Sequence, residues 1–81
     1  MESLIVEFDR SAVPAWIEEM VDEFTEDPHC RMVVVGADEA GVVMISMWPS
    51  RVVGDVEAAM RNMAPEALFR RLLMSVPGEE G

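Results

Sequence analysis

The amino-acid sequence predicts a small α+β domain in which a three-stranded, mainly antiparallel sheet packs against helices in the order β-α-β-β-α-α. Three patterns predict this fold: apolar alternation over residues 3–8, helical spacing of apolar residues over 13–24, and two short apolar runs joined by a glycine-flanked loop. A chain of 81 residues provides room for one domain. We place that domain at residues 1–76 and expect residues 77–81 to form a flexible C-terminal tail.

The first strand and the first helix are predicted from apolar periodicity. Every second residue of the first segment is apolar, which suits a strand with one well-buried face: Leu4, Val6 and Phe8. The helix is expected to have its N-cap at Ser11 or Val13, with Pro14 in its first turn, and to end at Asp27 because Pro28 follows. Its apolar stripe consists of Val13, Ile17, Met20, Val21 and Phe24.

Two strands joined by a hairpin are predicted next. Short β-branched apolar runs occupy residues 31–36 and 42–48, and Ala37–Ala40 between them has the composition of a turn. We expect the two strands to be antiparallel neighbours, with the second of them lying between the first strand of the chain and its hairpin partner. Because neither run alternates, both faces of the hairpin are buried, or one face is covered only by a partner.

The rest of the chain is predicted to form two further helices. The first carries Val52, Val56, Ala59, Met60 and Met63 on one stripe, with Asp55 as a candidate N-cap, and breaks near Pro65. The second carries Leu68, Phe69, Leu72, Leu73 and Val76. Glu66 and Arg70 have the i,i+4 spacing that stabilises a helix by roughly 0.2–0.5 kcal/mol.

Charge and cysteine content exclude several classes of function. The net charge is −10: residues 1–30 hold nine acids and one arginine (−8), and residues 31–81 hold seven acids and five arginines (−2). Without clustered Lys or Arg, we expect neither direct nucleic-acid binding nor membrane binding. A single cysteine excludes an internal disulfide, and no signal peptide or membrane span is visible, which favours a cytoplasmic protein.

The most informative feature is a run of six carboxylates with no positive charge among them: Glu18, Glu19, Asp22, Glu23, Glu26 and Asp27. Most of them lie opposite the apolar stripe of the first helix. Like-charge pairs at i,i+4, such as Glu18 with Asp22, destabilise an isolated helix, and a basic partner would relieve that repulsion. The alternatives are an ordinary solvated face and a site for a divalent cation.

No catalytic, cofactor or metal site is predicted. The nucleotide-binding glycine motifs, HExxH, GxSxG and the EF-hand loop are all absent. The only histidine and the only cysteine, His29 and Cys30, are adjacent, so on a strand they would point to opposite sides and could not readily share a metal ion. We expect Cys30 to be a small buried residue and His29 to lie at the edge of a loop.

Methionine and tryptophan residues serve either the core or a contact surface. Met44, Met47, Met60 and Met63 suit irregular packing. Trp48 precedes Pro49 at a strand end, where an aromatic side chain is often partly exposed and able to anchor an interface, and Trp16 flanks the acidic helix. We therefore include Trp16 and Trp48 with the carboxylates as candidate partner-binding residues.

Two functional hypotheses follow. The first is a non-enzymatic inhibitor that docks its acidic helix on a basic surface of a target protein, most plausibly a nucleic-acid-binding surface. In size, charge and β-α-β-β-α layout the chain resembles the small acidic inhibitors that phages direct against host defence, including anti-CRISPR proteins, and the immunity proteins that block nucleases. That resemblance implies steric occlusion of a target without a cofactor. The alternative is a structural or adaptor subunit that assembles, for example as a homodimer, through its apolar hairpin and Met-rich helices.

Overall fold

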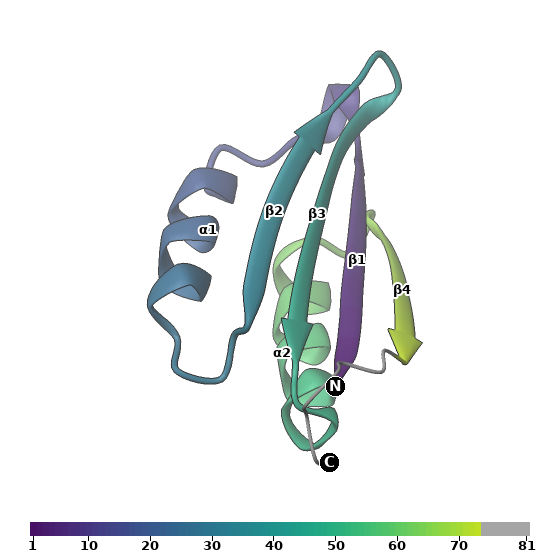
Figure 1. The fold of residues 1–81 in the computed structure, drawn as a ribbon. Coiled ribbons are helices and arrows are strands. Elements are labelled where there is room, and N and C mark those ends of the chain that lie inside the picture. Colours follow the sequence, from purple (N-terminus) through teal and green to yellow (C-terminus); the bar gives the residue numbers. More distant parts are fainter. Residues whose placement is uncertain (74–81) are drawn as a thin grey trace.

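Four strands form one antiparallel sheet, and two helices cover one of its faces (Figure 1). The computed structural model describes residues 1–73. Across the sheet the strands are ordered β2-β3-β1-β4, with β1 at Glu2–Asp9, β2 at Met32–Ala37, β3 at Gly41–Trp48 and β4 at Leu68–Leu73. A short 3-10 helix, η1 (Arg10–Ala12), follows β1; α1 (Ile17–Glu26) leads to β2, and α2 (Ser50–Met63) connects β3 to β4. Two split β-α-β units are thus interleaved, which is the ferredoxin-like topology.

The predicted third helix is wrong, and with it the three-stranded sheet. Residues 68–73 form β4, which pairs antiparallel with β1, and Arg70 contacts Glu7 of β1 at 3.3 Å instead of Glu66. Six residues are too few for a stable isolated helix, whereas pairing supplies hydrogen-bond partners along the edge of β1. Tertiary context therefore overrides the helical pattern. Val76 and the tail predicted at 77–81 lie outside the described residues.

The hairpin prediction and the strand order are confirmed. β2 and β3 pair antiparallel, and β3 lies between β2 and β1. The hairpin turns at Asp38, whose Oδ1 accepts hydrogen bonds from the amides of Ala40 and Gly41 at 2.8 and 3.0 Å. This carboxylate closes the loop that positions the two strands.

The helix boundaries differ from the predicted ones at their N-termini. Ser11 is not the cap of α1, because its hydroxyl and amide both donate to Asp9 within η1, at 2.6 and 3.0 Å. These bonds hold the pKa of Asp9 below its usual value. α1 begins only at Ile17, although it ends before Asp27 and Pro28 as predicted, and α2 begins at Ser50 rather than at Asp55. Within the described chain no helix is long and apolar enough to cross a membrane.

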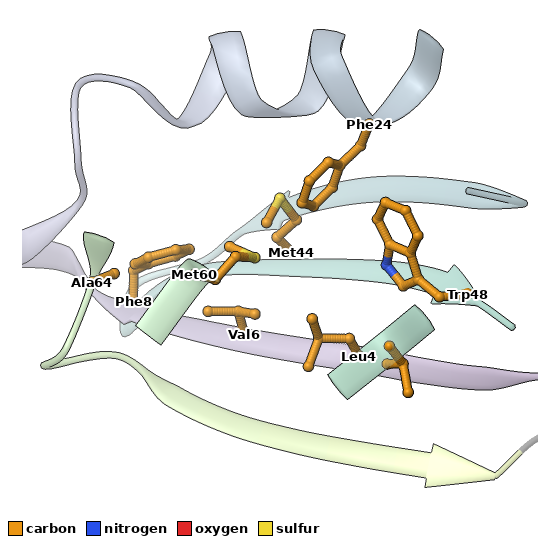
Figure 2. Close-up of a cluster of buried hydrophobic side chains, with 9 residues drawn as sticks. Leu4, Val6, Phe8, Phe24, Met44, Trp48, Met60 and Ala64 are labelled. Carbon is orange, nitrogen blue, oxygen red and sulfur yellow. The ribbon is translucent and has the colours of Figure 1, made fainter. Parts of the chain in front are cut away.

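The hydrophobic core lies between the sheet and the two helices (Figure 2). The alternation predicted for β1 is confirmed, because Leu4, Val6 and Phe8 all point into this layer. Trp48 donates an indole hydrogen bond to Ser46 Oγ at 2.8 Å, which satisfies two buried polar groups. The buried cluster consists of Leu4, Val6, Phe8, Phe24, Met44, Trp48, Val53, Met60 and Ala64.

The second face of the sheet, which we call the open face, carries no helix from residues 1–73. The strand register places three rows of four residues there, one residue from each strand in the order β2, β3, β1, β4. The rows are Met32, Met47, Ser3 and Leu72; Val34, Ile45, Ile5 and Arg70; and Gly36, Val43, Glu7 and Leu68. The prediction that both faces of the β2–β3 hairpin are buried is therefore wrong for this chain alone, since β2 is largely exposed.

Gly41 is the position at which the hairpin tolerates no side chain. A Cβ atom there would collide with the carbonyl oxygen of Phe8, a backbone atom that cannot move aside, whereas a Cβ at Gly36 meets only Val43 Cγ1 at 3.7 Å. We predict that Gly41→Ala lowers the free energy of unfolding by about 1–3 kcal/mol, as overpacking does. Gly36→Ala, the matched control, is expected to stay within about 0.5 kcal/mol of the wild type. Urea denaturation measures both, and equal effects would contradict the clash.

Candidate acidic interface on helix α1

Five carboxylates of α1 are exposed on one side of the helix: Glu18, Glu19, Asp22, Glu23 and Glu26. At about 100° per residue they span an arc of roughly 140°, opposite the side that holds Phe24. Asp27, the sixth predicted residue, differs from them. Its Oδ1 accepts a hydrogen bond from the amide of His29 at 2.8 Å and lies 3.4 Å from His29 Nδ1, so this carboxylate is already engaged in the turn that ends the helix.

Aromatic contacts fix α1 at both ends. Phe24 packs edge-to-face on Trp48, with ring centroids 4.9 Å apart, and Trp16, which precedes the helix, packs edge-to-face on Phe8 at 6.2 Å. Such geometries are favourable for aromatic pairs beyond the area they bury. The acidic side is therefore held on a packed scaffold rather than on a freely moving segment.

None of the ion pairs that His29, Arg61, Arg70 and Arg71 form involves the five exposed carboxylates of α1. Arg61 and Arg71 both contact Glu57, at 2.8 and 3.0 Å, and Arg70 contacts Glu7. Arg10 donates to the carbonyl oxygens of Asp38 and Glu39 in the hairpin. These four arginines therefore do not offset the repulsion along α1.

The fold places Arg70 and Arg71 away from α1. α1 packs against β2, at one edge of the sheet, whereas Arg70 and Arg71 belong to β4, at the other edge (Figure 1). Arg70 and Arg71 were expected near a helix C-terminus; on a strand they instead point to opposite faces. The negative potential is thereby concentrated on the α1 side of the protein.

The two predicted tryptophan anchors have different positions. Trp48 is only 1% exposed and forms the centre of the core, so the expectation that it is partly exposed is wrong. The reason is the register of β3, which turns Trp48 toward the helices beside Met44 and Ser46. Trp16 is half-buried at the start of α1 and remains a candidate contact next to the carboxylates.

His29 and Cys30 do not form a reactive pair. His29 is exposed in the turn after α1, as predicted, and its imidazole faces Asp27. The Cys30 thiol is half-buried and contacts the carbonyl oxygen of Met32 at 3.3 Å. Burial raises the pKa of this thiol above its ordinary value, with Asp27 adding to the effect and hydrogen bonds opposing it. A raised pKa is the opposite of what an activated nucleophile requires.

Two surface hollows are lined by residues of the described chain. One, of about 250 Å³, lies between Trp16, Phe8 and the segment after α2; another, of about 600 Å³, lies at the hairpin end of the sheet. Of the acids that border them, Asp9, Asp38 and Glu7 are engaged in a cap, a turn and an ion pair, and Glu66 borders both hollows. Among residues 1–73 no group of three or more His, Cys, Asp or Glu side chains could hold a metal ion.

Sequence reasoning identified the open face only in part. The apolar runs of β2 and β3 do not alternate with polar residues. This pattern indicates that one face of the hairpin is covered by a partner, which is one of the two interpretations given above. Its β4 part was hidden, because Leu68 and Leu72 were assigned to a helical stripe. The structure brings these residues onto one surface with Ile5 and Met47.

Comparisons with known proteins return no relative. No family model matches the chain, and no curated protein or solved structure matches it at a significant level.

Neutralising the middle of α1 is expected to stabilise the protein. Asp22→Asn with Glu23→Gln removes the like-charge pairs Glu18–Asp22, Asp22–Glu26 and Glu19–Glu23, while the first-turn acids that favour the helix dipole remain. We predict a gain of about 0.5–1.5 kcal/mol in the free energy of unfolding at low ionic strength, shrinking in 0.5 M NaCl because salt screens the repulsion. Urea titrations at both salt concentrations measure it. Glu39→Gln with Glu66→Gln, which removes the same charge elsewhere, is expected to give a smaller gain.

The Cys30 thiol is expected to react slowly with a disulfide reagent in the native protein. Only the thiolate attacks, and a pKa raised above its ordinary value leaves less thiolate at neutral pH. The rate at pH 7 should therefore be several-fold below that of the same chain in urea, and should keep rising as the pH passes the ordinary thiol pKa. Stopped-flow absorbance follows the reaction. If the Cys30 thiol reacted as fast in the native protein as in urea, or faster, a partly buried thiol with a raised pKa would be contradicted.

Proposed function

We propose that this protein is a non-enzymatic inhibitor that docks the acidic side of α1 on a basic surface of a target protein. The observation that carries the proposal is the set of five exposed carboxylates on one side of a packed helix, with like charges one turn apart. A cationic surface would relieve the repulsion within the helix, so part of the binding energy comes from removing an unfavourable interaction in the free protein. Trp16 supplies an apolar contact beside the charges.

Electrostatics governs how such a complex forms. A single-sign face steers a partner of opposite charge and raises the association rate, an effect that falls steeply with ionic strength. Arg70 and Arg71 lie on β4, at the far edge of the sheet, so these two arginines oppose the approach of a basic partner only weakly. Binding through α1 is therefore expected to be fast and sensitive to salt.

The target surface is proposed to be one that binds nucleic acid. Proteins present dense Lys and Arg patches mainly where they contact phosphate backbones. Carboxylates on successive turns of α1 repeat about every 5.4 Å, which places a row of negative charges where a backbone would otherwise lie. The protein would then act by occluding that surface, in the manner of anti-defence inhibitors or nuclease immunity proteins, without a cofactor.

The test is a capture experiment followed by competition. The immobilised 81-residue chain is incubated with lysate of its source cell, and captured proteins are challenged with duplex DNA or RNA. We predict that a basic protein is retained in 50 mM NaCl, released by nucleic acid, and lost when the bait carries Glu19→Gln, Asp22→Asn and Glu23→Gln. Each lost carboxylate contact is expected to weaken binding about three- to tenfold.

A charge-matched bait provides the control. Glu39→Gln, Asp55→Asn and Glu66→Gln remove three exposed acids outside α1 and leave the same net charge. This bait is expected to retain the partner. If both baits lose the partner equally, the interaction depends only on the net charge of the chain. If the α1 variant still retains the partner, the helix is not the docking surface.

A second candidate, a structural or adaptor subunit, is favoured by the uncovered apolar face of the β2–β3 hairpin. The Met-rich helices, the other surface named in this hypothesis, contribute less to an interface, because Met60 is buried in the core. If the protein is such a subunit, the acidic side of α1 faces water and binds no partner. The variant with Glu19→Gln, Asp22→Asn and Glu23→Gln would then still assemble.

A further inference from the structure

We infer that the open face of the sheet is the binding surface for a second copy of this chain, so that two sheets pack face to face in a symmetric dimer. This inference does not depend on whether α1 binds a target. The open face was defined above by three rows of residues; its outer strands expose large apolar side chains, with Val34 at 49% and Leu68 at 66%. Contiguous apolar patches of this kind mark interaction sites.

The chemistry of the open face disfavours nucleic acid as its occupant. Four-stranded sheets that bind RNA stack bases on aromatic side chains, with basic residues nearby. All five aromatic residues here lie elsewhere: Phe8, Trp16, Phe24 and Trp48 belong to the core side, and Phe69 packs under Arg61 at 4.5 Å. The open face holds a single cation, Arg70, which is paired with Glu7.

Charge favours a second copy over a basic partner. The open face is formally neutral, since it contains one acid and one arginine in an ion pair at 3.3 Å. The excess negative charge of the chain lies on α1, beyond the opposite face of the sheet. In a face-to-face dimer the two sheets lie about 10 Å apart, and both sheets stand between the two acidic helices. The distance between the helices therefore exceeds the Debye length of about 8 Å at physiological salt, so the copies do not repel strongly.

The size of the open face fits a small dimer interface. Four strands about 4.8 Å apart and three rows about 6.6 Å apart give a flat projection of roughly 400 Å² per copy. The accessible area is larger than this projection because side chains protrude from the sheet. The total area buried by the two copies therefore approaches the ~1,000 Å² that separates specific interfaces from incidental contacts. Interfaces at this small end of the range are typically weak, so we expect a dissociation constant of about 1–100 µM.

The relief of the open face is self-complementary. In its first row the small Ser3 stands between Met47 and Leu72, and in the middle row Ile5, only 9% exposed, lies between Ile45 and Arg70. The exposed side chains of β2 and β4 thus flank a lower centre. In a two-fold dimer each surface meets an identical one, and ridges of one copy can enter the hollow of the other. Both acidic helices then point outward, so the dimer presents two copies of the candidate interface.

Sedimentation equilibrium of the 81-residue chain at about 5–200 µM tests the inference. We expect a monomer–dimer equilibrium that persists in 0.5 M NaCl, because apolar burial drives it. Val34→Lys should raise the dissociation constant at least tenfold. The matched control is Val35→Lys, the next residue of the same edge strand, which is similarly exposed (41%) but points to the other face. It should leave the dimer intact. Circular dichroism verifies that both variants are folded, and Leu68→Lys replaces Val34→Lys if the latter unfolds.

Each contrary outcome identifies another arrangement. A monomer at every concentration overturns the inference. Equal disruption by Val34→Lys and Val35→Lys would indicate pairing of β2 edges, since lysine on either face of an edge strand hinders that pairing. Dissociation in 0.5 M NaCl would indicate contact between the arginines of one copy and the α1 carboxylates of another. Retention of the dimer by both Val34→Lys and Leu68→Lys would exclude the open face.

Discussion

Two helices of this length can cover only one face of a four-stranded sheet, and the rest of the structure depends on this constraint. The residues that point to the helices form the core around Trp48, Leu4 and Met44. The residues that point away have no cover within the described chain, although most of them are Val, Ile, Leu or Met. The protein therefore has a fully packed interior and a second apolar surface of comparable chemistry outside it.

The two outer surfaces follow different physics. The α1 side carries exposed carboxylates with like charges one turn apart, so its interactions are long-ranged and sensitive to salt. The open face is neutral and apolar, so its interactions are short-ranged and depend on buried area. Because the sheet lies between them, one surface can be occupied without blocking the other. The proposed target binding and the inferred dimer both use this separation.

The ferredoxin-like topology does not by itself define a function, because such common folds support many unrelated activities. Function depends instead on the side chains that this sequence places on the fold. The side chains that commonly anchor interfaces or catalyse reactions are withdrawn: Trp48 lies in the core, and the Cys30 thiol is partly buried with a raised pKa. Among the described residues, the largest accessible features are a charged helix and an apolar sheet face, and these are the surfaces from which binding is proposed.

The sequence alone determined the features that depend on local periodicity and charge. Alternation identified the buried face of β1, the Asp27–Pro28 pair ended α1, the glycine-flanked turn defined the β2–β3 hairpin, and the carboxylate run located the acidic side of α1. Tertiary structure decided what depends on distant partners. Residues 68–73 fit a helical stripe, yet they became a strand because β1 had an edge to pair. Strand register, which no local pattern specifies, placed Trp48 in the core and left Val34, Ile5 and Leu68 together on an uncovered face.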